Sequence, residues 1–273
     1  MPPPAKTPAM SSVDKALALL RHFSVHKPEI GLSELARLAG HDKTTVLRCM
    51  NALERNGFIE QDVQTRRYRL GLTPINLARI RERSFPLLAV LQPHLERLRD
   101  RTQETAHATV LSSGRLITTL ICEPDRATRV FMDPSLDLPP HATASGLAIL
   151  ANLPASGRAA LITGEPYEQF TPATPTNAAQ LEQLLEQTRR NGFGRVAQSY
   201  DADVVGTAVA YFGPTGLPAG AVAVAAVASR FDPTLAKLIE EELLSTGRAL
   251  THEFGGVLPA PHTSQSSKPE PAP

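Results

Sequence analysis

The sequence contains little sulfur, few aromatic rings and no long apolar run. Its only cysteines, Cys49 and Cys122, form no C-x-x-C pair, which excludes a disulfide framework and a cysteine-based zinc finger. The longest mainly apolar stretch, 219–228, is about half of a membrane span, and the first ten residues have no apolar signal segment. With 42% hydrophobic residues to form a core, the chain is predicted to be soluble and cytoplasmic, with no membrane partner.

Charge is unevenly distributed along the chain. Residues 1–83 carry 14 Lys and Arg against 8 Asp and Glu, whereas residues 84–273 carry 14 against 19. A basic first third followed by an acidic remainder predicts that one part of the chain contacts a polyanion and that the other has a different task. Both ends, 1–10 and 256–273, are predicted to be disordered tails because they are rich in proline and poor in core residues.

The basic third has the pattern of three helices followed by a hairpin. Ser12 is placed to cap the first helix, Ser33 the second and Asp42 the third, and Gly40 and Gly57 follow the ends of the last two. Strands are expected at 58–62 and 66–70. The inner faces of the helices are predicted to carry Val13, Ala16, Leu17, Leu20 and Phe23, then Leu35, Ala36, Leu38 and Ala39, then Val46, Leu47, Met50 and Leu53.

This order of elements is that of a winged helix-turn-helix, whose third helix enters the major groove of DNA. The first turns of that helix hold hydroxyl and cationic side chains suited to phosphates and base edges. The hairpin would follow the DNA backbone or the minor groove, and the start of the second helix would offer backbone amides to a phosphate. The predicted DNA-binding residues are Ser33, Lys43, Thr44, Thr45, Arg48, Arg66, Arg67 and Arg69.

The acidic remainder alternates helical and strand patterns. Its first helix should bury Leu91, Leu95 and Leu98, and its antiparallel strands and helices should surround an apolar centre. Helices are expected at 87–101, 144–152, from Thr176 or Asn177 to 190, and at 233–254, with strands at 106–111, 116–123, 128–132, 204–212 and 219–228.

Motifs of common enzymes are missing from the sequence. It contains no G-x-S-x-G, H-E-x-x-H, P-loop or G-x-G-x-x-G after a strand, so neither an enzyme nor a cofactor is predicted. No metal is assigned either. A zinc site formed by His107, Cys122 and His141 is the alternative for the acidic part.

Several segments occur together in one order: SVDKALALLRHF, LSELARLAG, DKTTVLRCMNALERNGFIEQD, RRYRLG, HATASGLAILA and NGFG. In these segments the chain resembles the IclR-type bacterial transcription regulators over about residues 11–254. The resemblance implies an α+β protein with a winged helix-turn-helix DNA-binding domain (11–71), a linker helix (72–84) and a GAF-like α/β effector-binding domain (85–255). It also implies homodimers or tetramers on palindromic operators in double-stranded DNA. Leu72, Ile75, Leu77 and Ile80 would pair between subunits, unless this stripe packs within the monomer.

In the resembled family, effectors bind at the start of the H-A-T-A-S-G helix and on the last two strands. Polar residues that many members carry there are replaced in this chain by Gly206, Ala223 and Ala225. The family's acidic position reads Val196, Ala197 or Gln198, unless a shifted register brings in Asp201 or Asp203. We therefore expect an apolar or aromatic effector rather than a small keto acid, and the alternative is a closed pocket in a domain that only dimerises. The effector-binding residues so implied are Phe131, Met132, His141, Thr143, Ala144, Ser145, Gly146, Gly206, Val222, Ala223 and Ala225, with Val224 as a further contact.

The sequence thus predicts a ligand-responsive transcription factor, a repressor rather than an activator. A stand-alone small-molecule sensor and a DNA-binding protein with an inert dimerisation domain are the competing interpretations.

Overall fold

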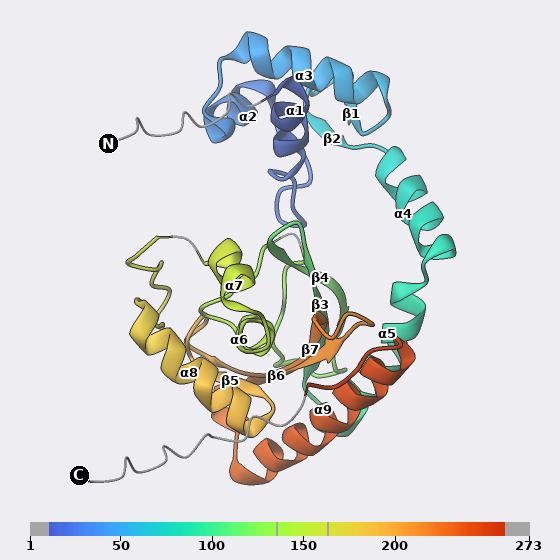
Figure 1. The fold of residues 1–273 in the computed structure, drawn as a ribbon. Helices are drawn as coiled ribbons and strands as arrows, with labels where there is room; N and C mark the ends of the chain where they lie inside the picture. Colours follow the sequence, from blue (N-terminus) through green and yellow to red (C-terminus); the bar gives the residue numbers. More distant parts are fainter. Residues whose placement is uncertain (1–10, 135, 163, 260–273) are drawn as a thin grey trace, which may run out of the picture. The chain divides into compact units, whose positions relative to one another are not determined.

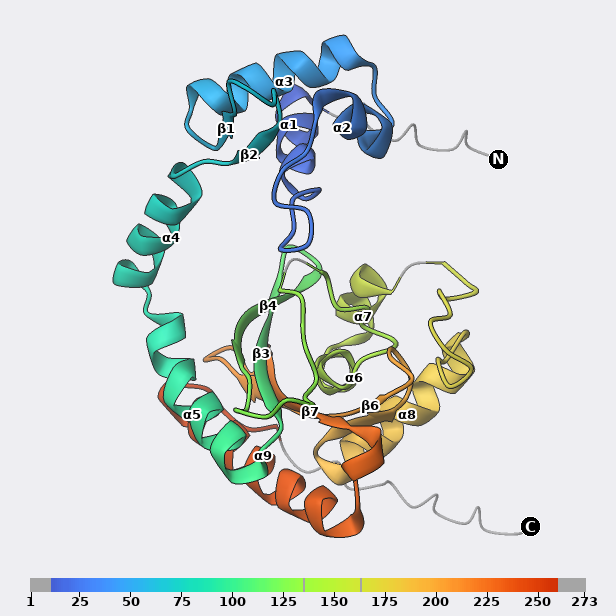
Figure 2. The same cartoon turned by 180° about the vertical axis from the view of Figure 1, so that it is seen from behind.

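The computed structural model describes residues 11–259 apart from 135 and 163, so the predicted tail 1–10 and most of the tail 256–273 lie outside the described residues. The chain divides into two units, the first ending at Pro86 and the second beginning at Leu87. Figures 1 and 2 show the elements of each unit from opposite sides. Within the described ranges, none of the helices combines the length and the apolar character needed to cross a bilayer.

The first unit contains helices α1 (Ser12–Leu20), α2 (Leu32–Ala39) and α3 (Lys43–Arg55), followed by strands β1 (Ile59–Gln61) and β2 (Tyr68–Leu70). The two strands pair antiparallel and form the wing (Figure 1). Asp42 caps α3 as predicted, since its side chain accepts a hydrogen bond of 2.8 Å from the amide of Thr45. The predicted caps of the other two helices were wrong, because Ser11 caps α1 and α2 begins after Gly31 with no side-chain cap.

The core of this unit differs in part from the predicted inner faces. Leu19 and Cys49 are buried, whereas Val13, Leu17 and Leu47 are 66%, 48% and 39% exposed. Leu38, at 37% exposed, also lies outside the core. The helices bury the faces that contact each other: in α1 these are Ala16, Leu19 and Leu20, and Phe23 joins the core just after the helix ends.

Helix α4 (Thr73–Ser84) follows the wing and buries none of its side chains. Its apolar residues stay largely uncovered: Leu72 before it is 70% exposed, and Ile75, Leu77 and Ile80 are 51%, 50% and 56% exposed. The alternative in which this stripe packs within its own unit therefore finds no support.

The second unit is built on an antiparallel sheet with the strand order β4-β3-β7-β6-β5. Its strands are β3 (Thr105–Ser112), β4 (Arg115–Cys122), β5 (Gly194–Ala197), β6 (Val204–Phe212) and β7 (Pro218–Val227). Its helices are α5 (Leu87–Thr102), α6 (Ala144–Ala151), α7 (Ala155–Leu161), α8 (Ala178–Asn191), the short η1 (Ala228–Arg230) and α9 (Pro233–Glu253).

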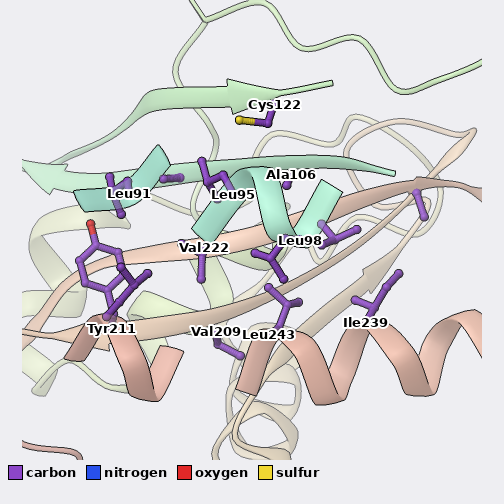
Figure 3. Close-up of a cluster of buried hydrophobic side chains, with 14 residues drawn as sticks. Leu91, Leu95, Leu98, Ala106, Cys122, Val209, Tyr211, Val222, Ile239 and Leu243 are labelled. Atoms are coloured by element: carbon purple, nitrogen blue, oxygen red, sulfur yellow. The ribbon is translucent and has the colours of Figure 1, made fainter. Parts of the chain in front are cut away.

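Helices cover both faces of this sheet. Leu91, Leu95 and Leu98 of α5 are fully buried, as predicted, and pack with Ile239 and Leu243 of α9 on one face (Figure 3). On the other face, α6 and α8 pack against the sheet through a second core. Alternate residues of β7 divide between these cores: Val222, Val224 and Ala226 face α5 and α9, whereas Ala221 and Ala223 face α6.

Three features of this unit were missed or misassigned from the sequence. No strand forms at 128–132, where the carbonyls of Thr128 and Val130 accept hydrogen bonds from the side chains of Arg230 and Thr105 instead of from a neighbouring strand. Helix α7 and strand β5 were not predicted, since both are short and β5 begins at a glycine.

Candidate DNA interface and ligand pocket

Helix α3 has one buried and one exposed face. Val46, Cys49, Met50 and Leu53 are buried against the first unit's core, which directs the opposite side of the helix to solvent. The predicted contact residues Lys43, Thr44 and Arg48 are exposed, and Thr45 is half-buried beside the cap. The cap also lowers the pKa of the Asp42 carboxyl, because the Thr45 amide hydrogen-bonds its charged form.

Two residues of the exposed face were not singled out from the sequence. Leu47, expected in the core, and Asn51 are both exposed, and at helical spacing they continue the row that Thr44 and Arg48 begin. An asparagine amide matches the edge of adenine in the major groove, and an apolar side chain matches the methyl group of thymine. The misplaced Leu47 thus extends the candidate DNA interface.

The three arginines of the wing differ in their surroundings. The guanidinium of Arg67 donates to the carbonyl of Glu29 at 2.7 Å, and that of Arg69 donates to the carboxylate of Glu60 at 3.0 Å. Arg66 has no side-chain hydrogen bond or ion pair among the described residues, and it adopts the left-handed conformation at φ 57° in the wing turn. Of the three guanidinium groups, that of Arg66 is therefore the one available to bind a phosphate without first breaking a bond within the described protein.

Ser33 lies inside the first turn of α2, where it is exposed. The hydroxyl is therefore not used as a cap, and the first turn keeps backbone amides that no side chain satisfies. A phosphate near Ser33 would meet these amides and the hydroxyl together.

In the second unit, several of the predicted effector residues lie at the start of α6 and on the strands beside it. Thr143 caps this helix, with its hydroxyl oxygen accepting from the amide of Gly146 at 3.2 Å. Ala144 lies over β6, since a Cβ atom at Gly206 would approach the Ala144 Cβ to 3.3 Å. Gly146 is equally confined: a Cβ there would meet the Pro140 carbonyl oxygen at 2.0 Å.

Three adjacent strands lie beneath this helix start. His107 of β3 pairs with Ala223 of β7, and Ala225 of β7 pairs with Gly206 of β6. We call these four residues the pocket floor. The hydroxyl of Ser145 lies 3.3 Å from Nε2 of His107, which joins the floor to the first turn of α6.

His107 is the polar residue of the pocket floor. It is 6% exposed, and burial alone lowers its pKa from 6.5 to about 4. From the sequence, His107 was expected to be a strand histidine or, alternatively, a zinc ligand, and its contact with Ser145 at the start of α6 was not predicted. The zinc interpretation was wrong, because Cys122 faces the opposite core and the described residues contain no group of three such ligands.

Other predicted effector residues lie elsewhere. Val222 and Val224 face α5 and α9, so including them in the pocket was wrong. Phe131 is 57% exposed and Met132 is half-buried, on the segment where the Val130 carbonyl accepts a hydrogen bond from the Thr105 hydroxyl. The His141 ring donates to the Glu168 carbonyl at 2.8 Å. Asp201 and Asp203 are exposed before β6, whose pairing with β7 runs unshifted from Val204 to Tyr211.

A cavity of about 320 Å³ lies apart from the pocket floor. It is lined by residues of the β3–β4 turn, of the segment 137–140 and of two aromatic side chains, Phe170 and Tyr200. None of the predicted effector residues contributes to its lining.

An exposed basic recognition helix with a wing, joined to a separate α/β domain, defines a DNA-binding transcription regulator. The IclR helix-turn-helix domain matches residues 12–63, and the bacterial transcriptional regulator IclR C-terminal domain matches residues 82–252. The chain therefore belongs to the IclR family of bacterial transcription regulators, which are not enzymes.

Similar proteins span nearly the whole chain. The HTH-type transcriptional regulator XynR of Escherichia coli (strain K12) is 27% identical, over 91% of this chain and 98% of its own. The Transcriptional repressor IclR of the same strain is 23% identical, over 92% of each chain. A crystal structure of an IclR transcriptional regulator from Silicibacter sp. TM1040 superposes with a TM-score of 0.82 at 38% identity, covering 91% of this chain and 98% of that one.

Proposed function

We propose that this regulator represses transcription by binding a palindromic operator as a dimer or a pair of dimers. The observation that carries the proposal is the exposed face of α3, where Lys43, Thr44 and Arg48 lie opposite a fully buried face. A palindrome requires two such helices related by two-fold symmetry. Repression is the activity named for the E. coli relative, Transcriptional repressor IclR.

We further propose that a small molecule bound between the pocket floor and the first turn of α6 alters operator binding. The support is the convergence of a helix N-terminus, a buried histidine and small side chains at one place. Such a ligand regulates only if it binds the DNA-bound and free arrangements with different affinity.

One observation favours a second candidate, a domain that dimerises without binding a ligand. The close approach of Ala144 to Gly206 leaves little free space at that point of the floor. The two candidates differ in one measurable property, because an inert domain would leave operator affinity unchanged by any small molecule.

The test of DNA recognition is selection of binding sites from random DNA by the full-length protein at fixed salt. An enriched inverted repeat is expected, and it should be lost when Lys43 and Arg48 are both changed to alanine. Lys237→Ala, which removes an exposed charge from α9, should leave the selected sequence unchanged. Selection of no common sequence by the wild-type protein would contradict the proposal.

A further inference from the structure

The side of α3 that lies opposite the core carries one straight row of side chains. Thr44, Arg48, Asn51 and Arg55 follow one another at intervals of four, three and four residues, which keeps them on one line along a helix. All four are exposed, and the buried residues of α3 lie on the other side of the helix. This row is therefore the part of α3 that would lie deepest in a major groove.

Asn51 lies in the middle of this row, and no hydrogen bond joins its side chain to another group among the described residues. The nearby Asn56 differs, since its amide donates to the Ala52 carbonyl at 2.8 Å. Glu54, the acidic side chain closest to the row in sequence, accepts from the backbone amide of Gln61 at 3.2 Å and is thereby directed toward β1. A base pair facing the row would thus meet the unpaired amide of Asn51.

We propose that Asn51 reads an adenine in the operator, one or two base pairs away from a guanine that Arg48 reads. An asparagine amide both donates and accepts, which matches the N6 amino group and N7 of adenine. The guanidinium of Arg48 only donates, which matches O6 and N7 of guanine. The inference rests on the proposed function of the first unit in sequence-specific DNA binding and specifies the bases of each half-site.

The spacing of the two bases follows from the dimensions of the two kinds of helix. Arg48 and Asn51 are three residues apart, which is about 4.5 Å along an α-helix. Successive base pairs of B-DNA are about 3.4 Å apart. Side chains at this separation face neighbouring base pairs, and the greater length of the arginine side chain adds at most one more.

The place of Asn51 in the row favours a base over a phosphate as its contact. Phosphates line the edges of the groove, where side chains on the flanks of the helix reach them, and Lys43 lies about a quarter turn away from Asn51 on such a flank. Asn51 is short and central, so base edges are the groups within its reach. A phosphate contact would add to the affinity for all sequences alike, whereas a base contact sets the preference at one position.

The test is selection of binding sites from random DNA by the full-length wild-type protein, Asn51→Ala and Arg48→Ala at one salt concentration. The wild-type protein should enrich an inverted repeat with an adenine and a guanine one or two base pairs apart in each half. Asn51→Ala should lose the preference for that adenine alone, and Arg48→Ala the preference for that guanine alone. In titrations, replacing the A·T pair in one half-site should weaken wild-type binding about fivefold or more. The same replacement should leave binding by Asn51→Ala nearly unchanged.

Asn56→Ala is the matched control, since it removes the same amide from the end of the same helix, where that group is bound to the Ala52 carbonyl. It should select the wild-type sequence. The assignment is overturned if the wild-type half-site lacks this pair of bases at this spacing, if a folded Asn51→Ala protein still selects the adenine or loses preference at every position, or if Asn56→Ala shows the same loss. Selection of no common sequence by the wild-type protein would instead contradict the proposed function itself, and the assignment with it.

Discussion

Among single residues, His107 is distinguished by burial without a charged neighbour. Desolvation is the cause of its lowered pKa, about 4 instead of 6.5, and its contact on the ring is the neutral hydroxyl of Ser145. The protein therefore retains a group that opposes folding once it is protonated. A role of the neutral His107 ring in binding a ligand would explain why the protein keeps a buried histidine at this position.

This burial predicts a pH dependence of stability. The unfolded chain binds a proton at His107 below pH 6.5 and the folded chain only near pH 4, so stability falls as the pH is lowered. Between pH 7 and pH 5 we expect His107 to contribute a loss of about 2 kcal/mol. Urea unfolding at both pH values should show a smaller loss in His107→Asn, while His252→Gln, at an exposed position of α9, should behave as wild type. An undiminished loss in His107→Asn would contradict this.

Which residues of a helix are buried depends on the surface of the neighbouring helices, and the sequence alone does not show that surface. Spacing identified helix α3 and three of its four inner residues, but the buried face includes Cys49 and leaves Leu47 39% exposed. In α1 the buried residue is Leu19, and Leu17 is 48% exposed. We expect the exposed side chain of Leu47 to contact a thymine methyl group in the operator.

At the scale of elements, the wing combines one unoccupied arginine with two that hold the fold together. Arg69 pairs with Glu60 across the hairpin, and Arg67 connects the wing to the segment before α2. Arg69 would have to give up its partner to contact a phosphate, whereas Arg66 would not.

This difference predicts unequal effects on the salt dependence of operator binding. Arg66→Gln should reduce the magnitude of the slope of log K against log salt concentration by about 1, the value for one lost phosphate contact. Arg69→Gln removes the same charge from the same hairpin and should change the slope less. Binding titrations over a range of salt concentrations measure both, and equal changes in the two variants would refute the distinction.

Sequence patterns identified most of the elements, and failed where tertiary contacts decide the outcome. Strand β6 was predicted at its observed bounds, because a long β-branched run between turns has few alternatives. The faces of β7 were not predictable, since both sides of a covered sheet are apolar and Val222 looks as suitable for the pocket as Ala223. The segment 128–132 has strand-like composition, but side chains of Arg230 and Thr105 occupy its carbonyls.

At the scale of the whole molecule, the proposed function requires two copies of the chain. Helix α4 directly follows the wing and exposes a row of apolar side chains that a monomer leaves in water. A second copy covering this helix would bury them and would fix two DNA-binding units relative to each other. Because the stripe lies next to the DNA-binding elements in the chain, we propose that α4 couples dimerisation to DNA binding.

This coupling predicts that one charge on α4 weakens both dimerisation and operator binding. Ile80→Glu places a carboxylate in the apolar stripe, and we expect it to shift the protein toward monomers and to weaken operator binding in parallel. Ala78→Glu introduces the same charge at an exposed position two residues away, which points to the other side of the helix. It should leave both the oligomeric state and the operator affinity unchanged.

Sedimentation equilibrium gives the oligomeric state, and binding to a full palindrome and to a half-site gives the DNA affinity. A monomeric Ile80→Glu protein should bind both DNAs equally, since the second half-site then adds nothing. If the variant stays dimeric, or is monomeric yet keeps its preference for the palindrome, the role assigned to α4 is wrong.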